Sequence, residues 1–209
     1  MLDIKMIKSS KISEFQISSS YEVVIALPMI DVVLAKKASE IMKVRTRQAG
    51  LLILIEDDIR LGFIMVANIV YAKTESRYFV YVAQDAFAGE FWLDYALETI
   101  KKTNCGLLAF NEGRFFGEIA CFGLVDRQWV NTLYKNFVFY PQYKSHFADM
   151  ELSVIAAKTQ NLVFNPKAIL MEVDYEKHLQ PNNIIDRELY RERVRTGFDG
   201  RIEPFIFIP

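Results

Sequence analysis

The sequence has little of what marks a secreted, membrane-spanning or nucleic-acid-binding protein. It contains two cysteines, Cys105 and Cys121, both in apolar surroundings, which predicts buried reduced thiols and gives no basis for a disulfide framework. Lys and Arg (25) nearly balance Asp and Glu (26), so the net charge of -1 provides no field that would attract nucleic acid. No window reaches the roughly 18 uninterrupted apolar residues of a membrane span.

The chain also lacks internal repeats, low-complexity segments and an evident linker. Its first stretch, "MLDIKMIKSSKISEF", alternates Lys with apolar residues and has no apolar core of the kind found in signal peptides. We therefore expect a cytoplasmic protein. The 209 residues, 52% of them hydrophobic, suffice for one domain with a sizeable core, so residues 1–209 are interpreted as a single domain.

Apolar strands and amphipathic helices alternate along the first half of the chain. Asp31 is placed to cap one of these helices, and Gly50 to end it. The regular alternation predicts an α/β fold with a parallel sheet and right-handed crossovers. The expected strands are 21–28, 51–58, 78–85 and 105–110, and the expected helices are 31–49, 61–73 and 89–104.

Several polar residues fall where these strands end. Glu56, Asp57 and Asp58 close the second strand, and Asp85 closes the third, "YFVYVAQD". In parallel α/β sheets, ligands bind beyond the carboxyl ends of the strands. Asp85 also has a structural interpretation as a helix cap, but a cap would lie closer to the helix that begins near Gly89. We therefore expect Asp85 to belong to a functional site.

The second half is less regular. Residues 117–134 are interpreted as a strand leading into a helix, and residues 147–160 as a helix with Asp149 and Glu151 in its first turn. Acids in a first turn stabilise their own helix by about 0.3–1 kcal/mol, so a structural role competes with a functional one. Residues 162–178 are expected to form a strand, a Pro turn and a second strand. The tail follows from residue 181 to residue 209.

Three stretches together carry a resemblance to a known family: "LGFIMVANIVYAKTESRYFVYVAQDAFAGEFW", "GEIACFGLVDRQWVNTL" and "FADMELSVIAAKTQNLVFNPKAILMEVDYEKH". Their order and spacing resemble small glycosyltransferases of GT-A fold, similar to family 2 enzymes that use nucleotide-diphospho-sugars. The resemblance covers residues 21–178. It implies a Rossmann-like, mostly parallel sheet flanked by helices, with a smaller mixed C-terminal part. Residues 21–110 would form a nucleotide-binding half, residues 111–180 an acceptor-side half, and residues 181–209 a tail.

The resemblance also implies an activity. A sugar would pass from a nucleotide-diphospho-sugar, expected to be UDP-linked, to a hydroxyl of a glycan or glycolipid acceptor, with inversion at the anomeric carbon. A divalent metal, Mn2+ or Mg2+, would neutralise the diphosphate leaving group. The implied setting is surface polysaccharide or lipopolysaccharide assembly, at the inner face of the membrane, with no nucleic acid as a partner.

The same resemblance assigns the catalytic and metal-binding residues. Asp85 matches the last aspartate of the family's metal motif, and His178 matches a histidine that completes the metal site. Asp149 matches the catalytic base, with Glu151 as the other candidate in that turn. The sequence departs from the family where Ala83 and Gln84 precede Asp85, since two acids are usual there, and Ala148 replaces the acid that usually precedes the base.

Further residues are assigned to the donor site. Pro28 begins the first nucleotide-contacting loop, and Asn68 lies beneath the nucleotide. Glu56 or Asp57 is expected against the nucleobase, where a carboxylate accepting from a base N–H favours uracil. Gln84 is expected beside Asp85.

Two other functional classes compete with a transferase. A GT-A-like binding or scaffolding domain without turnover is compatible with the incomplete acid motif. A nucleotidyltransferase would need a Gly-rich basic loop after the first strand, and "ALPMIDVVLAKK" has no Gly.

The tail segment "RELYRERVRTGF" is interpreted as a solvated helix because its charges pair at helical spacing. Its functional alternative is a lid in which Arg193 or Arg195 covers the diphosphate.

Overall fold

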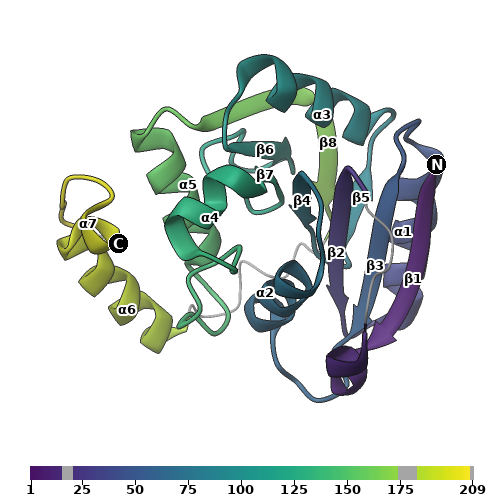
Figure 1. The fold of residues 1–209 in the computed structure, drawn as a ribbon, viewed down its shortest axis with the longest axis horizontal. Helices are drawn as coiled ribbons and strands as arrows, with labels where there is room; N and C mark the ends of the chain where they lie inside the picture. The colour runs from purple at the N-terminus through teal and green to yellow at the C-terminus, as the bar shows by residue number, and fades with distance from the viewer. Residues whose placement is uncertain (16–20, 174–182, 208–209) are drawn as a thin grey trace.

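The computed structural model describes residues 1–15, 21–173 and 183–207, and it confirms the α/β class (Figure 1). Its strands form one sheet in the order β1-β3-β2-β4-β7-β6-β8-β5. The strands are β1 (Leu2–Lys8), β2 (Val23–Met29), β3 (Gly50–Glu56), β4 (Tyr78–Tyr81), β5 (Ala86–Ala88), β6 (Leu107–Asn111), β7 (Gly123–Asp126) and β8 (Leu162–Glu172). The helices are η1 (Ser9–Glu14), α1 (Val32–Val44), α2 (Phe63–Lys73), α3 (Trp92–Thr103), α4 (Arg127–Tyr134), α5 (Ala148–Lys158), α6 (Ile184–Arg195) and α7 (Gly197–Gly200).

The first four neighbours in the sheet, β1, β3, β2 and β4, are parallel. β7 then pairs antiparallel with both β4 and β6. The expected fourth strand, observed as β6, therefore runs in the same direction as β4 but is not its neighbour. The ends of β2, β3, β4 and β6 consequently open onto one edge of the sheet.

Each face of the sheet carries its own apolar core. In β2, Val24 and Ala26 face α2, α4 and α5, while Val23, Ile25 and Leu27 face α1 and α3. This alternation follows from the two-residue period of a strand, and burial on both faces explains why β2 is apolar throughout. Figure 1 shows α1 and α2 on opposite sides of the sheet.

The structure corrects several expected boundaries. Gly50 does not end a helix: α1 ends at Val44, and Gly50 opens β3, where a Cβ would overlap the Val23 side chain. β1 is an edge strand that the alternating Lys residues concealed. β8 runs through Pro166 without the expected turn, because the β6–β8 register shifts between Ala109 and Asn111 and absorbs the proline in an irregularity.

The helix of the tail, α6, is exposed to solvent on one side only. Arg191 does pair with Glu188 at 2.6 Å, as the charge pattern predicts. The other side of α6 is buried, however, with Tyr190 and Val194 in the core on the α5 side and Phe198 of α7 beside them. In Figure 1 this yellow segment lies at the opposite end of the molecule from β1. None of the helices in the described ranges is long and apolar enough to cross a membrane.

Candidate functional site

A cleft of about 1110 Å³ opens at the edge where β2, β3 and β4 end. One side consists of the chain after these strands, represented by Ile30, Asp57 and Asp85. The other side consists of the loop between β6 and β7, the first turn of α5, and the end of β8. The cleft therefore lies where an α/β sheet places its ligands, between the two halves expected from the sequence.

Asp85 lies in the floor of this cleft and is 3% exposed. β4 ends at Tyr81, earlier than the sequence predicts, and a turn closed by the Ala86 N–H on the Ala83 carbonyl places Asp85 just before β5. The Asp85 carbonyl accepts from the Val173 N–H at 3.1 Å. The end of β8 therefore borders Asp85.

Gln84 lines the cleft but is used to build it. Its Oε1 accepts from the N–H groups of Ile30 (2.7 Å) and Asp31 (2.9 Å). Asp31 in turn caps α1 by accepting from the Leu34 N–H at 2.9 Å, as predicted. Gln84 thus fixes the loop that follows β2. Pro28 is the penultimate residue of β2 and lines the cleft just before this loop.

The acids after β3 separate into different environments. Asp57 lines the cleft, and its carboxylate accepts from Ser9 Oγ (3.0 Å), Leu61 N (2.9 Å) and Gly62 N (2.8 Å). These bonds shape the rim, and they occupy most of the acceptor capacity that we expected to face a nucleobase. Glu56 lies outside the cleft lining and forms an ion pair with Lys8 at 3.8 Å.

Asp58 is also a structural residue. It accepts from the Ser10 hydroxyl at 2.7 Å and from the Ser10 N–H at 2.9 Å, and these bonds lower its pKa to about 2. It therefore fastens the loop after β3 to η1.

Asn68 lies on the buried side of α2 and does not line the cleft. Its amide donates to the Phe139 carbonyl at 3.1 Å and accepts from the N–H groups of Val138 (3.1 Å) and Phe139 (2.9 Å). The amide is thus saturated by backbone groups. The structure gives Asn68 a structural role in place of the nucleotide contact that we expected.

Asp149 lies in the first turn of α5 and lines the cleft on the same side as the loop between β6 and β7. Burial raises its pKa, while the N–H groups of Met150 and Asp149 and the thiol of Cys121 act in the opposite direction. Burial likewise raises the pKa of Cys121, and the charge of Asp149 adds to that effect. A carboxylate with raised proton affinity, facing a cleft, is suited to accept a proton from a bound hydroxyl.

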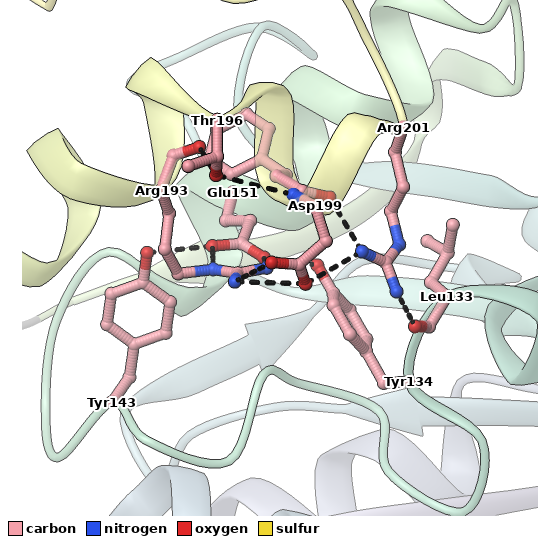
Figure 2. A network of polar contacts seen from close by, with 9 residues as sticks. Leu133, Tyr134, Tyr143, Glu151, Arg193, Thr196, Asp199 and Arg201 are labelled. Carbon is pink, nitrogen blue, oxygen red and sulfur yellow. Dashed lines mark hydrogen bonds and ion pairs between the residues drawn. The ribbon is translucent and has the colours of Figure 1, made fainter.

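Glu151 does not share this position. Two residues along a helix point in different directions, and the Glu151 side chain is fully buried behind the cleft wall. Figure 2 shows its carboxylate held by Arg193, with Nε at 2.7 Å and Nη2 at 2.6 Å, and by the hydroxyls of Tyr134 (3.0 Å) and Tyr143 (2.8 Å). Glu151 is therefore a structural anchor, and the expectation that it acts as a base is not supported by its position.

The position of Arg193 likewise does not fit a lid over the diphosphate. It is buried, and its Nη1 contacts Asp199, which also binds Arg201 (Figure 2). His178, expected to complete a metal site, lies outside the described residues. The chain nevertheless places another histidine in the cleft lining, His146, whose Nδ1 accepts from the Asn183 N–H at 3.3 Å.

Sequence reasoning missed three charged residues of the cleft, Arg60, Arg114 and Glu172. Arg114 follows β6, and its Nη1 lies 3.0 Å from Oε2 of Glu172 at the end of β8. Arg60 lines the opposite side, with a left-handed backbone (φ 58°). None of them lies in a motif, and the positions of Arg114 and Glu172 depend on the long-range pairing of β8 with β6 and β5.

The donor set fits a divalent cation held jointly with a ligand. Such cations take oxygen ligands and commonly retain water or substrate oxygens. Asp85 offers carboxylate oxygens in the cleft floor, but within residues 1–15, 21–173 and 183–207 no group of three or more His, Cys, Asp and Glu is arranged to hold a metal. The described part of the protein would therefore supply only part of the coordination.

No protein-family model and no curated protein matches the sequence. Among solved structures, the chain is similar to a mannosyltransferase from Pyrobaculum calidifontis in complex with GDP-Man and Mn2+, with a TM-score of 0.59 and 11% identity. The match covers 78% of this chain and 60% of the mannosyltransferase, so this chain corresponds to less than two thirds of that enzyme's length. Glucosyl-3-phosphoglycerate synthase from Mycobacterium tuberculosis, with Mg2+ and UDP, has a TM-score of 0.48 and 11% identity, covering 86% of this chain and 77% of the synthase.

The similarity to the mannosyltransferase shows the architecture of this protein. The chain has the GT-A fold, with a mostly parallel sheet flanked by helices. The fold expected from the sequence is thereby confirmed. Proteins that share a fold can have different activities, so the fold does not specify the activity of this chain.

Proposed function

We propose that this protein is a glycosyltransferase that moves a sugar from a nucleotide-diphospho-sugar to a hydroxyl of an acceptor. The observation that carries the proposal is the cleft at the strand ends, with Asp85 in its floor and Asp149 in the wall contributed by the acceptor-side half. A GT-A fold alone would permit other functions. The two carboxylates in one cleft would supply what this reaction needs, a ligand for the cation that binds the diphosphate and a proton acceptor.

The charge of the cleft supports a divalent cation, Mn2+ or Mg2+. Its lining contains the carboxylates of Asp57, Asp85, Asp149 and Glu172 but only two guanidinium groups. A cation bound together with the diphosphate would offset this excess of negative charge. Asp85 would hold that cation together with the diphosphate, and His178 remains a proposed further ligand. When bound, the cation supplies positive charge to the diphosphate as its bond to the sugar breaks.

In the reaction, the cleft aligns the acceptor hydroxyl with the anomeric carbon. The hydroxyl oxygen forms a bond to that carbon while the bond to the diphosphate breaks, and the electron pair leaves with the nucleoside diphosphate. Asp149 takes the hydroxyl proton. A single displacement of this kind inverts the anomeric centre. The apolar side chains of Phe115 and Phe147 in the lining would cover the faces of the sugars and exclude water.

We extend the proposal to the substrates. In our proposal the donor is a UDP-sugar. GDP-sugars are the alternative to be tested, because the Asp57 carboxylate is already bonded to Ser9, Leu61 and Gly62 and leaves recognition of the base to other groups. The acceptor is a hydroxyl of a glycan or glycolipid, in surface polysaccharide or lipopolysaccharide assembly. The protein would act in the cytoplasm, peripheral at the inner face of the membrane when its acceptor is lipid-linked.

The test is thermal stability against a panel of UDP- and GDP-sugars, with Mn2+ and with EDTA. A ligand at a hundred times its dissociation constant stabilises the folded state by about 2.7 kcal/mol. We expect metal-dependent stabilisation of the wild type by one donor, and loss of that effect in Asp85→Asn.

Asp3→Asn is the matched control, because it removes an exposed carboxylate of the edge strand β1 that accepts only from the Tyr21 hydroxyl among the contacts of the described residues. It should behave as the wild type does. If no nucleotide-sugar stabilises the wild type, the transferase proposal fails and a non-catalytic binding domain becomes the better interpretation.

A further inference from the structure

Arg114 is a cationic side chain in the lining of the cleft that contains Asp85. Its Nη1 lies 3.0 Å from Oε2 of Glu172. Glu172 ends β8 and is the register partner of Ala86, the residue after Asp85. The Val173 N–H also donates to the Asp85 carbonyl at 3.1 Å. The guanidinium is therefore tied to the strand that borders the proposed diphosphate position.

The turn that carries Arg114 is held by the buried carboxylate of Glu112. Glu112 is 1% exposed, and its Oε1 accepts from the N–H groups of Phe115 and of Arg114, the latter at 3.3 Å. The Glu112 carbonyl accepts from the Glu172 N–H at 3.3 Å, and Gly113 supplies the left-handed residue of the turn (φ 91°). A cation held in this way loses little freedom when it binds a ligand.

The guanidinium retains donors for a ligand. Arg114 lies over the Phe115 ring at 5.1 Å, and its bond to Glu172 uses Nη1. A guanidinium has five N–H donors in a planar fork that matches phosphate oxygens. At the strand end itself, Asp85 is preceded by Ala83 and by Gln84, whose amide oxygen is used on the loop after β2.

We propose that Arg114 is a direct ligand of the donor's diphosphate, oriented by Glu172, and that it carries part of the charge neutralisation otherwise left to the metal. The proposal rests on the proposed function of this cleft. Its consequence is that nucleoside diphosphates bind measurably in the absence of metal. That binding depends on Arg114, whereas the increment given by Mn2+ depends on Asp85.

The experiment is calorimetric titration of the full chain with UDP and GDP, and with UMP and GMP, each in EDTA and in Mn2+. We expect Arg114→Gln to weaken diphosphate binding in EDTA by about ten- to a hundredfold, as loss of a charge-assisted hydrogen bond does. Monophosphate binding should change by less than about threefold, because in our proposal the guanidinium binds the second phosphate, which a monophosphate lacks. Arg114→Lys should restore part of the affinity, since it keeps the charge without the fork.

Two further variants separate ligand binding from a structural role. Glu172→Gln removes the charge that orients Arg114 but keeps the guanidinium, so it should weaken diphosphate binding in EDTA by less than Arg114→Gln does. Arg77→Gln is the matched control: Arg77 pairs with Asp126 at 2.6 Å, its side chain is 41% exposed against 46% for Arg114, and it does not line the cleft. It should leave binding unchanged.

The outcomes are distinct. Suppose that the wild type binds UDP or GDP in Mn2+, and that Arg114→Gln binds it as tightly as the wild type does, both in EDTA and in Mn2+. The inference about Arg114 is then wrong, while the proposed function stands. Equal weakening by Arg114→Gln and Glu172→Gln also overturns it, because the pair is then only structural. If the wild type binds neither nucleotide with Mn2+, both proposals fail.

Discussion

Replacing Arg193 by Met would leave Glu151 fully buried without its guanidinium partner. Two charge-assisted hydrogen bonds would be lost, from Nε at 2.7 Å and from Nη2 at 2.6 Å. Each bond of this kind contributes about 1.5–3 kcal/mol. The guanidinium also stacks on the Tyr140 ring at 3.4 Å, worth about 0.5–2 kcal/mol. The remaining bonds from Tyr134 and Tyr143 offset part of the loss, so we expect a net cost of about 3–5 kcal/mol.

Urea denaturation at pH 7, followed by tryptophan fluorescence, measures this cost. Arg191→Met is the matched control on the same helix, since Arg191 pairs with Glu188 at 2.6 Å in an exposed setting. Exposed pairs contribute less than about 1 kcal/mol, so this control should unfold almost as the wild type does. The double variant Glu151→Leu/Arg193→Met removes both charges and should be more stable than Arg193→Met.

A cost below about 1 kcal/mol for Arg193→Met, equal to that of Arg191→Met, would refute the reasoning. It would mean that the buried pair in Figure 2 does not hold α6 to α5 in solution. A double variant less stable than the single variant would instead show that the pair contributes more than its desolvation costs.

Three further predictions concern single positions. Burial raises the pKa of Asp149 above 3.8, so the wild type loses stability as the pH rises through the pKa of the folded state. The melting temperature of Asp149→Asn should therefore exceed that of the wild type at pH 7 and equal it near pH 3.8. A lower melting temperature for the variant at pH 7 would contradict this. Asn68→Ala strands the backbone groups of Phe139 and its neighbour and should cost at least about 3 kcal/mol in urea while nucleotide binding persists. Gly106→Ala places a Cβ on the indole of Trp129 and should cost about 1–3 kcal/mol, whereas unchanged unfolding would show that the ring moves aside.

Local patterns predicted most of the helices and strands, but not which strands are neighbours in the sheet. The apolar strand at Val23–Met29 and the amphipathic α3 follow from two- and 3.6-residue periods that any window of the chain reveals. The insertion of β7 between β4 and β6 is a long-range pairing, and no local period encodes it. β1 escaped detection because an edge strand carries Lys residues that resemble a solvated segment.

The candidate site shows the same limit for side chains. The sequence placed Asp149 and Glu151 in one helical turn, but it could not say which carboxylate faces the cleft. That choice depends on Arg193, which lies 42 residues further along the chain from Glu151. The charge pattern of α6 likewise predicted the exposed pair at Arg191 and missed the buried guanidinium two residues later.

The position of Asp149 can be traced to one helix of the tail. At the first turn of α6, the buried carboxylate of Asp186 accepts from the N–H groups of Lys144 (2.9 Å), Ser145 (2.8 Å) and His146 (2.9 Å). At its last turn, Arg193 binds Glu151. The wall from residue 144 to residue 151 is thus held at both ends by buried charges of α6, and Asp149 lies between these anchors. A base fixed in this way is positioned before an acceptor binds, which is what a direct displacement requires. In our proposal the tail therefore supports the catalytic wall from behind, and none of its described residues lines the cleft.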